Sequence, residues 1–162
     1  MKRALAYFII KRLPETRFFG LKRSLLRIAG HDIASGVRVC SSVHFSGNGK
    51  VRIGADTWIG HDCMIVSSSS VYIGANVDIA PRVYIGTGTH IIDSMGDRVA
   101  GEGMSKDIQI GNGSWLCVGC IILPGITIGQ RSIVAAGAVV SKNVASKCMV
   151  AGMPARVVKF LK

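Results

Sequence analysis

The sequence has 162 residues, of which 49% are hydrophobic, 20 are glycine and 4 are proline. This length fits one domain, and the frequent glycine argues against a helical bundle and favours turn-rich β structure. The formal net charge is +11, and residues 1–30 contribute +7 of it, from eight Lys or Arg and one Glu. No apolar run approaches the ~20 residues that a membrane-spanning helix needs, which argues against an integral helical membrane protein.

The first predicted element is a basic amphipathic segment over residues 1–30. We expect one or two helices within residues 4–28, broken at Pro14 and Gly20. The segment is expected to cover the end of the following domain, and a peripheral contact with acidic lipid headgroups is the alternative. No RRM, KH or zinc-finger signature accompanies the charge, so no nucleic-acid partner is expected. Its candidate apolar contacts are Leu5, Phe8, Ile9, Leu25, Leu26 and Ile28.

Residues 31–162 are predicted to form a single domain that is built on a repeat of six residues. Period six fits neither a strand's alternation nor the 3.6-residue helical turn, so each unit is expected to be a short strand plus a corner. Three units make one triangular coil, and coils stack as parallel strands, which predicts an all-β solenoid. The repeating aliphatic residues are Ile53, Ile59, Ile65, Ile73, Ile79, Ile85, Ile110, Leu116, Ile122, Ile128, Val134 and Val140.

The repeat is interrupted between Ile85 and Ile110, where a loop is expected at about residues 87–107. The interval of 25 residues exceeds one 18-residue coil by seven, so about seven residues are expected to leave the prism. Insertions at solenoid corners often form the binding face. His90 stands at the start of this loop, where an imidazole can act as a general base near neutral pH. Asp93 or a backbone carbonyl would orient its other ring nitrogen.

The five cysteines and four histidines are the sequence's candidate zinc ligands of the nitrogen and sulfur type. Cys117 and Cys120 form a CxxC, but the repeat places Cys120 inward and Cys117 on a corner, and no second pair completes a zinc site. The three-histidine zinc site of the γ-type carbonic anhydrases is not expected either, because the repeat region holds His61 and His90 alone. No metal is therefore expected. Five cysteines without framework spacing and without an export signal predict free thiols in the cytoplasm.

The repeated [Ile/Val/Leu]-Gly-x-x-small-x resembles the hexapeptide-repeat acyltransferases, and this resemblance implies a left-handed parallel β-helix. The stretch "GTGTHIID" is similar to the histidine-containing stretch of the maltose and galactoside acetyltransferases. In that branch of the family, the histidine is the general base. The resemblance therefore implies that His90 is catalytic, with Asp93 as its candidate partner. Ile91 stands where that branch usually has proline, which affects the shape of the loop more than its chemistry.

The run "IQIGNGSWLCVGCIILPGITIGQRSIVAAGAVVSKNV" with "VAGMPARVVKFL" resembles the acetyl-CoA end of the same branch. Carried over residue by residue, the resemblance places Trp115 beside the pantetheine and the Val118 amide near the thioester oxygen. Arginine and lysine suit the nucleotide phosphates of CoA. Cys117 replaces a glycine, which narrows the pantetheine channel, and Ser141 replaces a threonine. The remaining implied CoA contacts are Ala136, Ser141, Lys142, Arg156 and Lys159.

The resemblance also implies a homotrimer with sites between neighbouring prisms, and acceptor contacts in "IGHDCMIVSSSS" at His61, Asp62 and Ser68. Gly60 and Ser68 replace an asparagine and an aspartate of the maltose-type enzymes, which argues against a maltose-like acceptor. The stretch "LKRSLLRIAGHDI" is closer in character to bacterial polysaccharide O-acetyltransferases.

The sequence thus predicts an acetyl-CoA-dependent O-acetyltransferase that acts on a sugar hydroxyl during surface polysaccharide assembly. The acceptor would be a sugar, a nucleotide sugar or a lipid-linked glycan. Two alternatives stay open. One is an N-acetyltransferase of a nucleotide-linked amino sugar, for which His90 would matter less, and the other is a non-catalytic trimeric scaffold that binds CoA or another anion.

Overall fold

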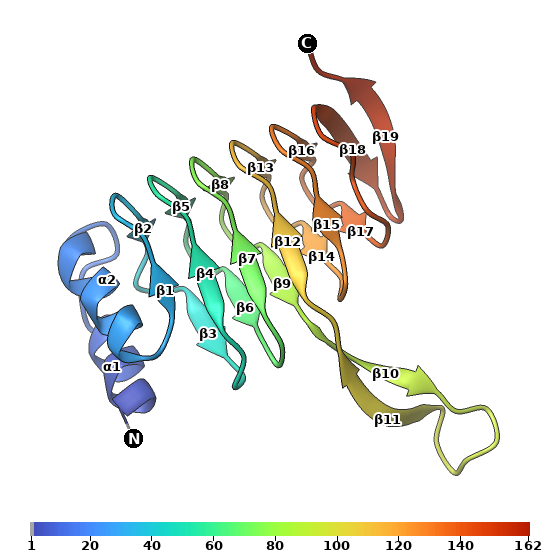
Figure 1. Cartoon of the computed structure of the whole chain (residues 1–162), viewed down its shortest axis with the longest axis horizontal. Helices are drawn as coiled ribbons and strands as arrows, with labels where there is room; N and C mark the ends of the chain where they lie inside the picture. The colour runs from blue at the N-terminus through green and yellow to red at the C-terminus, as the bar shows by residue number, and fades with distance from the viewer. Residues whose placement is uncertain (1) are drawn as a thin grey trace.

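The computed structural model describes residues 2–162, which form two short helices followed by a stack of triangular coils (Figure 1). The helices are α1 (Lys2–Ile10) and α2 (Phe19–Ile28). No helix among residues 2–162 is long and apolar enough to cross a bilayer. The coils form a left-handed parallel β-helix, as predicted.

Each coil contributes one short strand to each of three parallel sheets. The first sheet contains β1 (Asp32–Ile33), β4 (Val51–Ile53), β7 (Val71–Ile73), β12 (Ile108–Ile110) and β15 (Thr127–Ile128). The second contains β2 (Arg38–Val39), β5 (Trp58–Ile59), β8 (Asp78–Ile79), β13 (Trp115–Leu116), β16 (Ile133–Val134), β18 (Cys148–Gly152) and the antiparallel β19 (Ala155–Phe160). The third contains β3 (His44–Ser46), β6 (Met64–Val66), β9 (Tyr84–Gly86), β14 (Ile121–Ile122) and β17 (Val139–Val140).

The core consists of three columns of aliphatic side chains inside the prism, one column per sheet. Every aliphatic residue of the predicted six-residue repeat is at most 3% exposed, so the predicted positions of the repeat are confirmed. Burying one such side chain contributes roughly 1.5–3 kcal/mol, and the columns repeat this gain in each coil. The repeat also starts one coil earlier than the aliphatic frame indicated, because Ile33, Val39 and Phe45 occupy the same three columns.

The corner between the second and third sheets, here called the second corner, turns through a left-handed residue in four successive coils. These residues are Asp62, Arg82, Gly119 and Gly137, with φ angles of 55°, 61°, 66° and 66°. Glycine enters this conformation without steric penalty, whereas side chains other than Asn and Asp seldom adopt it. The repeated geometry places equivalent residues of the second corner in one row along the prism.

The corner between the third sheet and the first sheet of the next coil, here called the third corner, varies in length. It spans residues 47–50, 67–70 and 123–126 in three coils and residues 87–107 in a fourth. Within that long excursion, β10 (Gly88–Ile92) and β11 (Ala100–Ser105) pair as an antiparallel hairpin that projects away from the prism (Figure 1). The expectation that about seven residues leave the prism is wrong. Because β12 pairs directly with β7, no coil occupies this interval, and the part of the chain that leaves the stack, residues 88–105, is much longer than seven residues.

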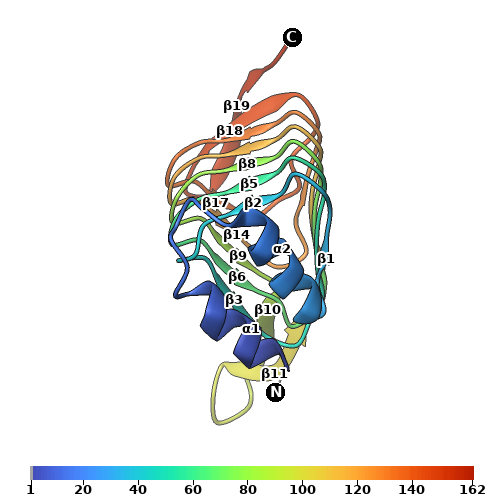
Figure 2. The same cartoon turned by 90° about the vertical axis from the view of Figure 1, so that its left-hand side faces the viewer.

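The two helices lie across the first coil at one end of the prism (Figure 2). Leu25 and Leu26 are buried there, whereas Leu5, Phe8 and Ile28 are more than half exposed. The expected break at Gly20 is wrong, because Gly20 is the second residue of α2 and the helices are instead separated by residues 11–18.

The buried ammonium of Lys22 fixes the linker between the two helices. Lys22 is 1% exposed, and its Nζ donates to the carbonyl oxygens of Pro14 (2.9 Å), Glu15 (2.6 Å) and Val39 (3.2 Å). Burial lowers the pKa of this amine. The three carbonyl acceptors come from the linker and from β2, so one side chain joins the helical segment to the first coil.

Candidate functional site

His90 lies on β10, outside the prism, with an exposed side chain. It stands opposite Gly103 of β11, so the antiparallel register of the hairpin fixes its position. Ser68 is one of the predicted acceptor contacts. Both residues line a depression of about 380 Å³ together with Gly88, Thr89, Gly103, Met104 and Ser105. The structure thus brings the predicted base and one predicted sugar contact to the same place.

The carboxylate of Asp93 forms hydrogen bonds within the turn at the tip of the hairpin. Its Oδ1 accepts hydrogen bonds from the backbone N–H groups of Met95 (3.0 Å) and Gly96 (2.9 Å). Within residues 2–162, no hydrogen bond joins Asp93 to His90. The observed role of Asp93 is to shape the turn, and its pairing with His90 stays a prediction.

Val118 and Ala136 occupy equivalent positions of the second corner in consecutive coils. The carbonyl oxygen of Val118 accepts a hydrogen bond from the N–H of Gly137 (2.9 Å), which joins the two turns. The N–H groups of Val118 and Ala136 donate no hydrogen bond within residues 2–162. Two backbone donors are therefore free at the position where the thioester oxygen and the pantetheine arm are expected. Such donors stabilise an oxyanion when they are placed within hydrogen-bond reach of it.

His61 belongs to the same row of the second corner. Its carbonyl oxygen accepts from the N–H of Arg82 (2.8 Å), and the carbonyl oxygen of Pro81 accepts from the N–H of Gly119 (3.0 Å). These bonds step from coil to coil, so His61 lies two coils from Val118, or about 10 Å at ~4.8 Å per coil. Asp62 follows His61 in the left-handed conformation, and its N–H donates to Ser42 Oγ (3.0 Å).

The expected CoA contacts fall into two groups on the single chain. Lys142 and Arg156 line one depression of about 170 Å³ near the end of the prism. Trp115, which is 49% exposed on the second sheet, lines another of about 250 Å³ with Arg131 and Lys147. The other expected contacts are Lys159 on β19 opposite Met149, and Ser141 directly after β17. One chain therefore does not enclose a CoA molecule by itself.

The two cysteines of the CxxC occupy different environments, as expected from the repeat. Cys120 is fully buried, and burial raises the pKa of its thiol to about 12. Cys117 is partly exposed on the corner, and both thiols are free. A thiol that stays protonated at neutral pH is a poor nucleophile and a poor metal ligand, so Cys120 is a packing residue.

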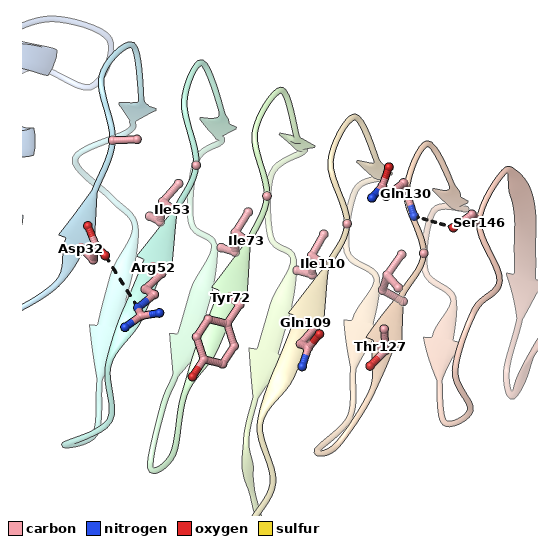
Figure 3. A pocket seen from close by; sticks show the side chains of 16 residues that line it. Asp32, Arg52, Ile53, Tyr72, Ile73, Gln109, Ile110, Thr127, Gln130 and Ser146 are labelled. Carbon is pink, nitrogen blue, oxygen red and sulfur yellow. Dashed lines mark hydrogen bonds and ion pairs between the residues drawn. The ribbon is translucent and has the colours of Figure 1, made fainter.

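A larger hollow lies elsewhere, on the outer face of the first sheet. It measures about 530 Å³ and contains a polar row that runs from the Asp32–Arg52 ion pair (3.7 Å) past Tyr72 to Gln109 and Thr127 (Figure 3). None of the predicted site residues lines it, and it holds neither a histidine nor a cysteine. The volume of a hollow therefore does not indicate where the predicted site residues lie in this chain.

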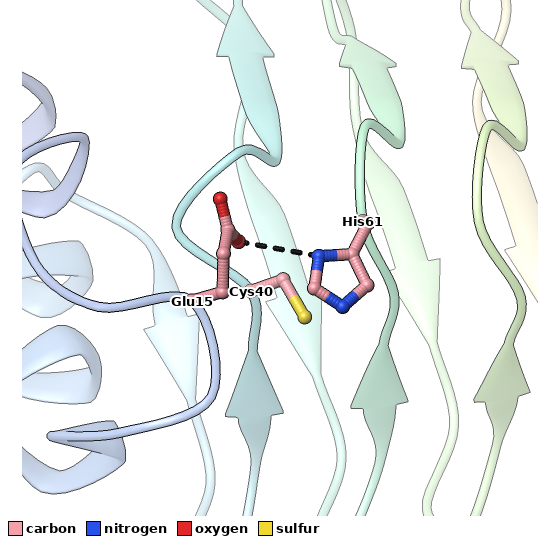
Figure 4. A group of neighbouring side chains, drawn as sticks. All are labelled: Glu15, Cys40 and His61. Carbon is pink, nitrogen blue, oxygen red and sulfur yellow. Dashed lines mark ion pairs between the residues drawn. The ribbon is translucent and has the colours of Figure 1, made fainter.

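A cluster that sequence reasoning missed surrounds His61. Glu15 of the helix linker lies 3.4 Å from His61 Nδ1, measured from its Oε2, and Cys40 lies beside both (Figure 4). The three residues come from the linker and from two coils, with no fixed spacing in the chain. No motif in the sequence could have indicated that Glu15 reaches this corner.

Comparisons with known proteins agree with this architecture. The family model described as bacterial transferase hexapeptide (six repeats) matches residues 107–142, and that of the hexapeptide repeat of succinyl-transferase matches residues 50–87. The galactoside O-acetyltransferase of Escherichia coli K12 is 33% identical over 138 residues, covering 85% of this chain and 68% of that protein. The putative colanic acid biosynthesis acetyltransferase WcaF of the same organism is 30% identical over 135 residues, covering 83% and 72%.

A solved galactoside acetyltransferase in complex with coenzyme A superimposes with a TM-score of 0.84 at 25% identity, covering 99% of this chain and 80% of that one. The chain spans little more than half of several other curated relatives. Fold, repeat and relatives agree, and the chain belongs to the hexapeptide-repeat acetyltransferases, in the branch of the galactoside and maltose O-acetyltransferases.

Proposed function

We propose that this protein transfers the acetyl group of acetyl-CoA to a sugar hydroxyl, with His90 as general base. The observation that carries the proposal is the position of His90, which is exposed on a hairpin that leaves the prism and adjoins a depression of about 380 Å³. The family supplies the acetyl donor, because a related structure is a complex with coenzyme A. The acceptor is inferred from the relatives, two of which are galactoside O-acetyltransferases.

The chemistry follows from the groups present. The imidazole of His90 accepts the hydroxyl proton as the oxygen attacks the thioester carbonyl, so that a C–O bond forms. The free N–H of Val118 stabilises the negative charge on the carbonyl oxygen. When the C–S bond breaks, the proton passes from the imidazole to the sulfur of CoA. Neither a metal ion nor a redox step is needed to balance this reaction.

The acetyl-CoA contacts are proposed along the upper part of the prism. The pantetheine arm would follow the second corner past Ala136 and Val118, with Trp115 beside it. Arg156 and Lys142 share one depression, and this concentrates positive charge for the nucleotide phosphates. Lys159 and Ser141 complete the proposed set, and His61, Asp62 and Ser68 are the proposed sugar contacts.

We propose a homotrimer because one chain separates the two halves of the site. His90 projects from the third corner, whereas Val118 and Ala136 lie on the second, and the third sheet stands between the two corners. A hairpin of one copy laid against the second corner of a neighbour would unite them. Closed symmetry of this kind repeats the same contact around the assembly.

The setting proposed is surface polysaccharide assembly at the inner face of the membrane. Relatives include a putative colanic acid biosynthesis acetyltransferase. The outer side of the helical segment exposes Leu5, Phe8, Phe18, Leu21 and Ile28, and residues 1–30 carry a net charge of +7. Apolar groups flanked by cations suit anionic lipid headgroups, where lipid-linked glycans are held. Five free thiols fit a cytoplasmic location.

The test is His90→Ala with His44→Gln as the matched control. Removing a general base typically lowers the rate 10²–10⁴-fold, so we expect His90→Ala to lose transfer while it still binds acetyl-CoA. His44 lies on β3, away from the hairpin, and its substitution should leave transfer unchanged. The measurement is thiol release from acetyl-CoA over a panel of sugars, nucleotide sugars and lipid-linked glycans.

Transfer by His90→Ala within threefold of the wild type would contradict the general-base role. Such a result with an amino-sugar acceptor would favour N-acetylation, because a free amine needs less help from a base. Binding of CoA without transfer to any acceptor would favour a non-catalytic scaffold.

A further inference from the structure

The linker and the first two coils place three side chains of different chemistry around one point. Glu15 comes from residues 11–18, Cys40 follows β2, and His61 lies on the second corner of the next coil. One donor atom from each residue lies within 4.8 Å of the other two. Figure 4 shows the carboxylate and the imidazole facing each other, with the sulfur of Cys40 beside them. A carboxylate, a thiol and an imidazole are the three ligand types that bind Zn²⁺ in proteins.

The thiol of Cys40 is buried without a hydrogen-bond partner. Cys40 is 0% exposed, and within residues 2–162 its Sγ makes no hydrogen bond. The buried thiols of Cys63 and Cys148 each donate to a carbonyl oxygen, of Ala80 (3.1 Å) and Ala145 (3.1 Å) respectively, whereas the buried thiol of Cys120, like that of Cys40, has no acceptor among residues 2–162. The sulfur of Cys40 instead points into the cluster with Glu15 and His61.

The cluster is held in place before any ion binds. Glu15 Oε2 accepts hydrogen bonds from the N–H (3.0 Å) and Oγ (3.1 Å) of Ser42, and Lys22 holds the Glu15 carbonyl. Burial opposes the charge on Glu15, but the bonds from Ser42 and the nearby His61 and Lys22 lower its pKa overall. These hydrogen bonds hold residues 11–18 in place, with the Glu15 carboxylate beside the second corner. Ligands fixed by surrounding hydrogen bonds bind metal more tightly than mobile ones.

We propose that Glu15, Cys40 and His61 bind one zinc ion, which joins the helical segment to the first two coils. Glu15 and His61 side chains are each 43% exposed, so the fourth coordination position is open to water. Burial raises the pKa of the Cys40 thiol, and the nearby Lys22 ammonium only partly opposes this shift. Zinc binding therefore displaces the thiol proton, and the resulting thiolate and the Glu15 carboxylate together neutralise the ion. The zinc site needs neither acetyl-CoA nor His90, so this inference does not rest on the acetyl transfer proposed above. The two proposals share His61, which would be a zinc ligand in place of a sugar contact.

The experiment uses the full chain after removal of metal with a chelator, and Co²⁺ and Zn²⁺ as probes. Co²⁺ should give a sulfur-to-metal charge-transfer band in the wild type and none in Cys40→Ser. Zn²⁺ should bind at one equivalent per chain, measured by competition with a chromophoric chelator. His61→Gln and Glu15→Gln should weaken zinc binding at least about 100-fold, more than the loss of an outer partner typically causes.

Matched controls are Cys117→Ser and His44→Gln, which remove a thiol and an imidazole elsewhere and should bind zinc like the wild type. Zinc should also raise the melting temperature of the wild type and of both controls, but not that of the three ligand variants, since a ligand that binds only the folded state stabilises it. This second readout separates a lost site from a misfolded variant. Absence of the charge-transfer band in the wild type, or equal zinc affinity of wild type and Cys40→Ser, would overturn the proposal.

Discussion

At the scale of single residues, the hydrogen bonds of His31 select one neutral tautomer of its imidazole ring. The ring is 6% exposed, its Nδ1 accepts from the N–H of Val51 (3.2 Å), and its Nε2 meets the hydroxyl of Tyr7. A backbone N–H can only donate, so Nδ1 carries no proton and Nε2–H donates to Tyr7. Burial, with a smaller effect of Arg3, lowers the pKa of His31 to about 4. The neutral ring thus joins α1 to the first two coils.

This arrangement predicts a loss of stability in mild acid. The pKa of about 4 in the folded state lies below the ordinary 6.5, so the unfolded chain binds the proton more tightly. The contribution of His31 is therefore complete above pH 6.5 and decreases as the pH falls toward 4. Between pH 7 and pH 5 the free energy of unfolding should fall by about 2 kcal/mol more in the wild type than in His31→Gln.

Urea unfolding of both proteins at the two pH values is the measurement. Carboxylates common to the two proteins cancel in the difference. An equal fall in wild type and variant would show that His31 is not the titrating group.

At the scale of elements, the β10–β11 hairpin is attached to the prism without being part of it. Lys106 N–H donates to the carbonyl oxygen of Thr87 (2.9 Å), and Asp107 Oδ1 accepts from the N–H of Ser70 (2.8 Å), so the base of the hairpin is closed. β12 pairs with β7 through Ile108, Gln109 and Ile110 regardless of what lies between. The hairpin therefore takes no part in the pairing of β12 with β7.

Replacing residues 88–105 by an Asn-Gly turn between Thr87 and Lys106 should leave the fold intact and abolish transfer. Asn-Gly suits a two-residue connection of antiparallel strands, which the Thr87–Lys106 bond already defines. Circular dichroism and the melting temperature should match the wild type, and acetyl release should drop as in His90→Ala. A variant that unfolds would show that the hairpin supports the coils, and one that keeps full transfer would remove the hairpin from the mechanism.

At the scale of the whole molecule, the prism separates groups that the proposed reaction needs together. The exposed His90 and the free N–H of Val118 are on different corners, and Trp115 is apart from Arg156. In the proposed trimer, a neighbouring copy would supply the missing half. Such an assembly would also account for the distribution of the predicted site residues over several separate hollows.

Light scattering of the purified protein should therefore give three times the chain mass of 17.2 kDa. Because the contacts that complete the proposed site are between copies, the assembly should persist at micromolar concentration. A mass of 17.2 kDa under these conditions would contradict the trimer and would leave the proposed half-sites without a partner.

The sequence by itself determined the fold, because in a solenoid each residue contacts its equivalent one coil away. Outside the interval between Ile85 and Ile110, that distance along the chain is nearly constant, so the periodicity records the tertiary contacts directly. Because the repeat is so regular, its interruption after Ile85 was visible in the sequence and drew attention to His90 at the start of the interval. Family resemblance then supplied roles for residues such as Val118 and Arg156, which remain proposals.

Only the tertiary structure showed the contacts between residues whose separation along the chain follows no repeat. The interval between Ile85 and Ile110 could hold a coil or none, and strand pairing showed that it holds none. Glu15, Cys40 and His61 meet because the linker folds back over two coils, held by Lys22. Such contacts depend on how a non-repeating segment packs against the end of the prism, and no period in the chain encodes that packing.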